Sequence, residues 1–205
     1  MRNNIISMAL AFILCISLGI FFTGCGEPSP KESVSTFLDA LKSGDSETMN
    51  SVYADKDISI LDVIFDSDNE GGYLASDSFE QRLTDSVLGF DYVIEDEAVN
   101  GDKATVKVTI KTYPMGEALT NAYNDMMSRI WELAFLEESE LDAKLAGILN
   151  ARWDEMTEKS YESEVEISLL KADGKWVVDS LDGNDDFINA ITGNLINALD
   201  NLDLE

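Results

Sequence analysis

Two runs of alternating apolar and polar residues meet at Asn100-Gly101, and this pattern constrains the fold more than any other feature of the chain. Asn-Gly is the strongest local signal for a two-residue turn between antiparallel strands. Apolar side chains at every second position lie on one face of a sheet whose other face is solvated. These positions are Phe90, Tyr92 and Ile94 before the turn, and Ala104, Val106, Val108 and Ile110 after it. A similar pattern surrounds Asp173-Gly174, so the sequence predicts two β-hairpins.

Between the two β-hairpins, the apolar residues recur at the spacing of a helix. This spacing predicts an inserted helical hairpin over 115–159, with Ser139 capping its second helix. Further helices are predicted on both sides: two that meet at Gly44 and Asp45, one that begins at Asp77, and a single final helix over 187–199. Helices segregated from antiparallel strands are typical of an α+β fold.

The first residues predict export and lipid attachment. Arg2 is followed by an almost unbroken apolar run over 5–22, and small residues precede Cys25. This order is that of a secretory signal peptide, and a Cys directly after the small residues resembles the lipobox of bacterial lipoproteins. We interpret residues 1–24 as the signal peptide, 25–30 as the lipidated cysteine with a short tether, and 31–205 as a single domain.

This interpretation locates the protein at the cell membrane, on its extracytoplasmic face, held by fatty acyl chains such as palmitate at Cys25. The alternative is an uncleaved apolar anchor, because the run over 5–22 is close to the ~18 residues that span a bilayer. Both alternatives put the residues after Cys25 on the outer side, since Arg2 favours the cytoplasmic side for the N-terminus.

Composition excludes several classes of function. Of the two cysteines, Cys15 lies in the signal peptide and Cys25 would be acylated, so the domain has no thiol chemistry and no disulfide. The chain has no His, which removes Ser-His-Asp triads and His-ligated zinc. Its formal net charge is -26 and all 40 acidic residues follow Cys25, which argues against nucleic-acid binding.

Two segments carry a resemblance to a known family. The stretch 30–45, PKESVSTFLDALKSGD, looks like the opening of domains with the nuclear transport factor two-like fold. The stretch 170–179, LKADGKWVVD, resembles the last hairpin of that fold. The whole chain, including 186–195, is similar to uncharacterised lipoproteins of Gram-positive, clostridia-like bacteria. The resemblance implies a curved antiparallel sheet wrapped around N-terminal helices as a cone, with a C-terminal helix, in a family of isomerases, dehydratases and non-catalytic binders. The helical hairpin over 115–159 departs from the simple cone.

An acidic loop has the spacing of a calcium-binding loop. Asp66, Asp68, Glu70, Gly71 and Asp77 fall at positions 1, 3, 5, 6 and 12 of that pattern. Position 12 is Asp rather than the longer Glu, and Asp77 has a sufficient role as a helix cap. We therefore favour a solvated acidic loop and expect no metal and no cofactor.

An acid–base site in the cone is a second candidate. The resemblance implies isomerases of the same fold that use a buried carboxyl group with tyrosine partners, and Asp91, Tyr92, Tyr113 and Tyr53 are available here. Strand alternation places Asp91 opposite the apolar face and therefore in water, which argues against catalysis.

The inserted helical hairpin carries an aromatic and methionine set. Its members are Tyr123, Met126, Met127, Trp131, Phe135 and Trp153. At helical spacing such residues predict the core of the hairpin, and the alternative is a groove for a ligand or a partner helix. Arg82, Arg129 and Arg152 are scarce cations that we expect to pair with neighbouring carboxylates.

These observations favour a non-catalytic, membrane-anchored module that binds a small molecule or an envelope protein, and not an enzyme. One alternative is a small hydrolase or isomerase that works with carboxylates in the cone. Another is a structural subunit of an envelope complex that docks through the helical hairpin.

Overall fold

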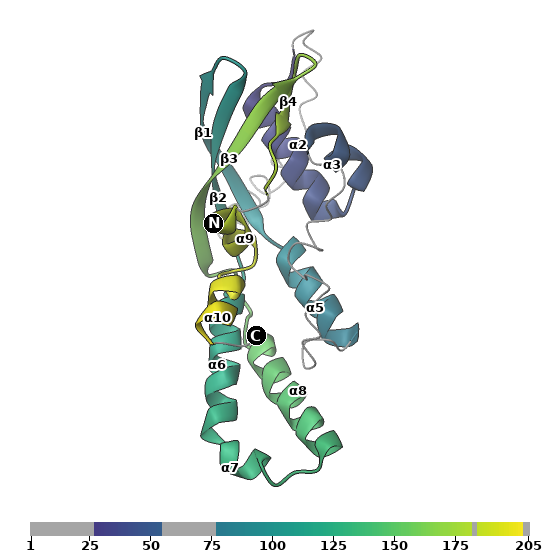
Figure 1. The fold of residues 1–205 in the computed structure, drawn as a ribbon, viewed down its shortest axis with the longest axis vertical. Helices are drawn as coiled ribbons and strands as arrows, with labels where there is room; N and C mark the ends of the chain where they lie inside the picture. Colours follow the sequence, from purple (N-terminus) through teal and green to yellow (C-terminus); the bar gives the residue numbers. More distant parts are fainter. Residues whose placement is uncertain (1–26, 55–76, 182–183, 203–205) are drawn as a thin grey trace, which may run out of the picture.

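The computed structural model describes residues 27–54, 77–181 and 184–202, and it has an elongated shape (Figure 1). The four-stranded sheet lies at one end and the helical hairpin at the other (Figure 1). The structure confirms the predicted α+β class. It has a curved, open antiparallel sheet, N-terminal helices, an inserted helical hairpin and a helical C-terminal segment.

The sheet consists of the two predicted hairpins placed side by side. Its strands are β1 (Asp91–Asn100), β2 (Lys103–Thr112), β3 (Tyr161–Ala172) and β4 (Lys175–Val178), in the order β1-β2-β3-β4 and all antiparallel. Gly101, Asp173 and Gly174 adopt positive φ angles in the turns, as tight hairpin turns require. A bulge between Ile94 and Glu97 interrupts the edge strand β1.

One face of the sheet forms the core. Val106 pairs with Ile167 and Val108 with Val165 across β2 and β3, and all four are buried. Helix α2 (Pro30–Ser43) and helix α9 (Asp185–Ile191) pack against this face. The opposite face is polar, because alternate residues of β2 and β3 point to solvent.

Helix α2 has strong signals at both ends. Ser29 and Glu32 form a reciprocal capping box at its start, and Gly44 ends it in the left-handed conformation with φ 68. Asp45 then caps α3 (Ser46–Val52) by accepting from the Thr48 N–H at 3.0 Å. This N-terminal pair agrees with the prediction, as does the start of α5 (Asp77–Leu88).

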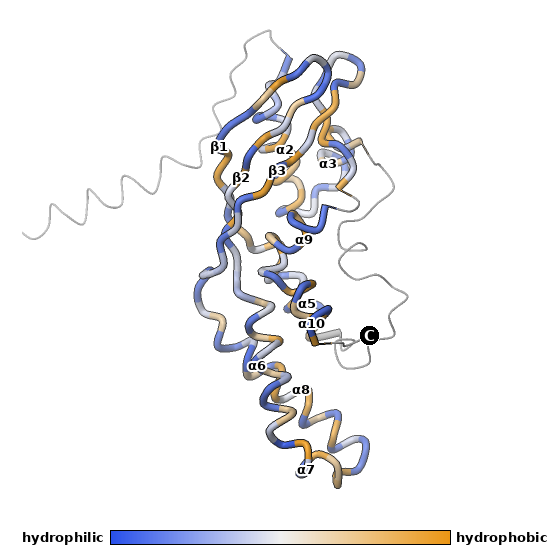
Figure 2. The backbone as a smooth tube through the Cα atoms, turned by 60° about the vertical axis from the view of Figure 1, so that its left-hand side comes forward, coloured by the Kyte–Doolittle hydropathy of each residue, from blue (hydrophilic) through white to orange (hydrophobic). Residues whose placement is uncertain are grey.

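The helical hairpin begins one residue after Pro114. It contains α6 (Met115–Ser128), the one-turn helix α7 (Ile130–Leu133) and α8 (Glu138–Asp154). The prediction that Ser139 caps the second helix is wrong, because α8 begins at Glu138 and its N-cap is Glu137. Figure 2 shows hydrophobic residues at α7, at the end of the molecule farthest from the sheet.

The single predicted final helix is also wrong. The chain forms α9 and then α10 (Leu195–Asn201), separated by Thr192, Gly193 and Asn194, of which Gly193 and Asn194 have positive φ. Gly193 lies against the backbone of Tyr113, where an added Cβ would be 1.9 Å from the carbonyl oxygen. The break lets this turn pack against the start of the helical hairpin. Asn184 caps α9 by accepting the Phe187 N–H at 3.0 Å.

Candidate functional site

Asp91 is placed in water, as the strand alternation predicted. Its side chain is 61% exposed and pairs with Lys159 at 2.7 Å and with Lys42 at 3.7 Å. The hydrogen bond from Lys159 holds the pKa of the Asp91 carboxyl below its usual value. Buried catalytic carboxyls of the type considered above need the opposite shift, so this geometry does not build an acid–base site around Asp91.

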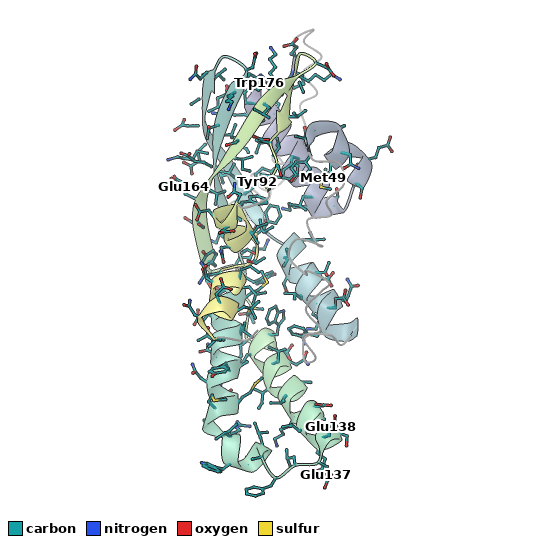
Figure 3. All side chains as sticks on the ribbon, in the orientation of Figure 1. Met49, Tyr92, Glu137, Glu138, Glu164 and Trp176 are labelled. Atoms are coloured by element: carbon teal, nitrogen blue, oxygen red, sulfur yellow. The ribbon has the colours of Figure 1, made fainter. Side chains whose placement is uncertain are left out.

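Tyr92 of β1 makes its hydrogen bonds to residues of α2. Its hydroxyl donates to Asp39 Oδ1 at 2.7 Å and lies 3.0 Å from the Ser35 hydroxyl oxygen. Burial, together with the neighbouring Asp39 carboxylate, raises the pKa of Tyr92 to about 12. The hydrogen bond to Asp39 joins β1 to α2; Tyr92 is labelled in Figure 3.

The other two tyrosines lie elsewhere. Tyr53 is buried, and its hydroxyl accepts the Leu181 N–H at 3.0 Å. Tyr113 is half-buried and lines a hollow beside α5 and α8. The fold thus assigns the four predicted acid–base residues to different contacts and does not gather them around one cavity.

Most of the candidate calcium loop lies outside the described residues. Asp66, Asp68, Glu70 and Gly71 lie outside the described residues, and Asp77 is the first residue of α5. Within 27–54, 77–181 and 184–202, no three acidic, cysteine or histidine residues are grouped so that they could hold a metal ion.

An open hollow of about 320 Å³ lies between α5 and α8, and sequence reasoning did not find it. Arg82 donates from α5 to Asn150 and Asp154 on α8, and Trp153 Nε1 donates to Ser86 Oγ at 3.1 Å. Three of the residues that line the hollow, Arg82, Ser86 and Trp153, are therefore already used to join the two helices. The residues that line the hollow are far apart in the chain, so no local pattern predicts it. The sequence signal that pointed to this place was Arg82, one of few cations in an acidic chain.

Two of the three arginines pair with carboxylates as predicted. Arg82 pairs with Asp154, and Arg152 pairs with Asp125 at 2.7 Å, which links α8 to α6. Arg129 makes no ion pair with any residue that the structure describes, so the prediction does not hold for it.

The aromatic and methionine set divides into a core part and a surface part. Trp153 is 5% exposed and packs edge-to-face on Phe79, with ring centroids 4.9 Å apart. Tyr123 and Met126 are half-buried, whereas the core interpretation is wrong for Trp131 and Phe135, which are 81% and 85% exposed. The reason is that α6 ends at Ser128, so these two rings lie beyond the region where α6 and α8 pack together. Met127 and Ile130, each 45% exposed, lie beside them in the sequence.

Comparison with known proteins gives one informative match. No family model matches the chain, and no curated protein matches it. The crystal structure of a candidate lipoprotein from Bacillus subtilis, YcdA, is similar with a TM-score of 0.51 and 15% sequence identity. The match covers 78% of this chain and 55% of that one, so this chain matches about half the length of its neighbour. At this identity the likeness concerns the fold, and the resemblance to the nuclear transport factor two-like family stays a prediction.

In the described parts of the chain, no helix combines the length and the apolar character needed to cross a membrane.

Proposed function

We propose that the protein is a lipoprotein, anchored through Cys25 to the extracytoplasmic face of the cell membrane, and that it is a non-catalytic binding module. The sheet end lies near the membrane and the helical hairpin is held away from it, where it contacts a partner.

The observation that carries this proposal is the position of the N-terminal residues at the end of the molecule opposite the helical hairpin. Glu27 pairs with Lys171 of β3 at 2.9 Å, and the Lys31 N–H donates to Glu97 of β1 at 3.1 Å. One residue separates Glu27 from Cys25, and two extended residues span at most about 7 Å. An acylated Cys25 therefore keeps the sheet end at the bilayer.

The labelled residues in Figure 3 illustrate this polarity. Trp176 of β4 lies at the sheet end, while Glu137 and Glu138 lie at the far end of the helical hairpin (Figure 3). A membrane-bound protein with this arrangement presents the hairpin to the surrounding envelope.

Three further observations support the proposal. The lipobox-like end of the signal peptide supports acylation, and the similar Bacillus subtilis structure is itself that of a candidate lipoprotein. Three of the four candidate acid–base residues have structural partners: Asp91 pairs with lysines, Tyr92 bonds to Asp39, and Tyr53 accepts the Leu181 N–H. These contacts favour binding over catalysis.

The experiment is fractionation of cells that produce the full chain, with metabolic labelling by an alkyne analogue of palmitate. We expect the labelled protein in the membrane fraction and its degradation by protease added to intact spheroplasts. Cys25→Ser should abolish the label, whereas the matched control Cys15→Ser should keep it, because Cys15 lies within the signal peptide. Persistence of the label in Cys25→Ser, or protection of the wild-type protein from external protease, would contradict the proposal.

A further inference from the structure

The far end of the helical hairpin, from the last turn of α6 through α7 to the residues before α8, exposes a group of large apolar side chains, which we call the apolar tip. It consists of Met127, Ile130, Trp131 and Phe135, and Trp131 and Phe135 are more than four-fifths exposed. The other large apolar residues that are exposed in the described parts of the chain, Val93 and Val99, lie on β1. Aromatic residues and methionine are enriched in the cores of protein interfaces, which makes the apolar tip a candidate contact surface.

The apolar tip is not needed to fill the interior of the helical hairpin. That role belongs to Leu133, Ile148 and Leu149, which are 4%, 7% and 3% exposed. Leu133 lies between Trp131 and Phe135 in the chain. Its side chain is buried, while those of Trp131 and Phe135 are exposed to solvent. Exposed aromatic rings that contribute little to the fold are the usual anchors of a binding site.

Charge defines the kind of surface that fits the apolar tip. Between residues 127 and 144 there are five carboxylates and two cations, Arg129 and Lys144. Lys144 pairs with Glu132 at 3.6 Å, whereas Glu137, Glu138 and Glu140 are exposed. The rings are therefore bordered by net negative charge, and a complementary surface has apolar character at its centre and basic residues at its rim.

Two other occupants are disfavoured by the same observations. A second copy of the chain would bring the same carboxylates against each other, which opposes self-association. An anionic bilayer repels them as well. Helix α7, which carries Ile130 and Trp131, lies at the end of the molecule farthest from the sheet (Figure 1), whereas Glu27, two residues after the proposed anchor, pairs with Lys171 of β3.

We infer that the apolar tip inserts Trp131 and Phe135 into an apolar groove, rimmed by lysine or arginine, on a protein of the cell envelope. This inference rests on the proposed function for the position of the tip relative to the membrane.

Site-specific photocrosslinking in the bacterium that produces the chain tests the inference. Benzoylphenylalanine replaces Trp131 or Phe135 in the full chain, and the matched control replaces Val93, which is 60% exposed on the sheet. We expect an adduct with one envelope protein from positions 131 and 135 and none from position 93. The crosslinked peptide of the partner, identified by mass spectrometry, should be apolar and flanked by Lys or Arg.

Charge reversal provides the second part of the test. Glu137→Lys combined with Glu138→Lys should remove most of the adduct, whereas Glu158→Lys, an exposed carboxylate between α8 and β3, should leave its yield unchanged. Insensitivity to reversal at 137 and 138 would overturn the electrostatic part of the inference.

The adducts also separate this inference from the proposed function. Adducts with lipid alone would identify a membrane as the occupant, and adducts with a second copy alone would identify self-association, and both overturn the inference. If no adduct forms while the same cells show the protein in the membrane fraction, the anchoring proposal stands and the assignment of the apolar tip fails.

Discussion

The carbonyl oxygen of Gly193 accepts a hydrogen bond from the Gly116 N–H at 2.9 Å. This contact joins the turn between α9 and α10 to the first turn of α6, and so it connects the C-terminal helices to the base of the helical hairpin. An added Cβ at Gly116 would lie 2.3 Å from the Asn194 carbonyl oxygen, so the two backbone segments approach too closely for any side chain.

Gly193→Ala should destabilise the protein by about 3 kcal/mol or more, because it combines a positive φ with a clash against the Tyr113 carbonyl. Gly147→Ala is the matched control, since nothing lies within 4 Å of its added Cβ on α8. Loss of a helical glycine there should stabilise the protein by up to about 1 kcal/mol. Urea unfolding at pH 7 measures both, and equal free energies of unfolding for the two variants would contradict the close-contact explanation.

Trp131→Ser and Phe135→Ser should each change the free energy of unfolding by less than about 0.5 kcal/mol, because both rings are exposed. Trp153→Ala should cost about 3–5 kcal/mol, since it leaves a cavity beside Phe79. Thermal and urea unfolding of the three variants check the division of the aromatic set. A large loss for Trp131→Ser would show that the tip belongs to the core after all.

Tyr92→Phe should cost about 1 kcal/mol at pH 7, because the hydrogen bond to Asp39 is lost. The pKa of Tyr92 is about 12 in the folded protein and 10.0 for an ordinary tyrosine, so the stabilisation is complete below pH 10 and declines as pH rises toward 12. The stability difference between wild type and Tyr92→Phe should therefore shrink over that interval. Urea unfolding between pH 7 and pH 11 measures it, and a constant difference would contradict the raised pKa.

Calcium and EDTA should leave the melting temperature of the protein unchanged. The described residues contain no candidate metal group, and the loop over 66–77 fits a solvated acidic segment on sequence grounds. Differential scanning fluorimetry with calcium, magnesium as the matched control ion, and EDTA checks this. A calcium-specific increase, lost in Asp66→Asn with Asp68→Asn, would instead identify the loop as a metal site.

The sequence by itself determined the features that depend on neighbours along the chain. The two β-hairpins follow from alternation and from turn residues such as Gly101, and α2 ends at Gly44, because period, turn chemistry and capping act within a few residues. The same locality places Asp91 on the solvated side of β1, which the structure bears out with its lysine partners.

Only the tertiary structure decided which of several similar residues are buried and where continuous patterns break. Trp131 and Trp153 have the same apolar character and both occur at helical spacing, yet Trp131 is exposed and Trp153 is buried, because Trp153 packs on Phe79 of α5 while Trp131 lies on α7 at the far end of the hairpin. The final helix breaks at Gly193 because the backbone of Tyr113, remote in the sequence, lies against it. Such contacts depend on how distant segments meet in space, and no local pattern in the chain encodes them.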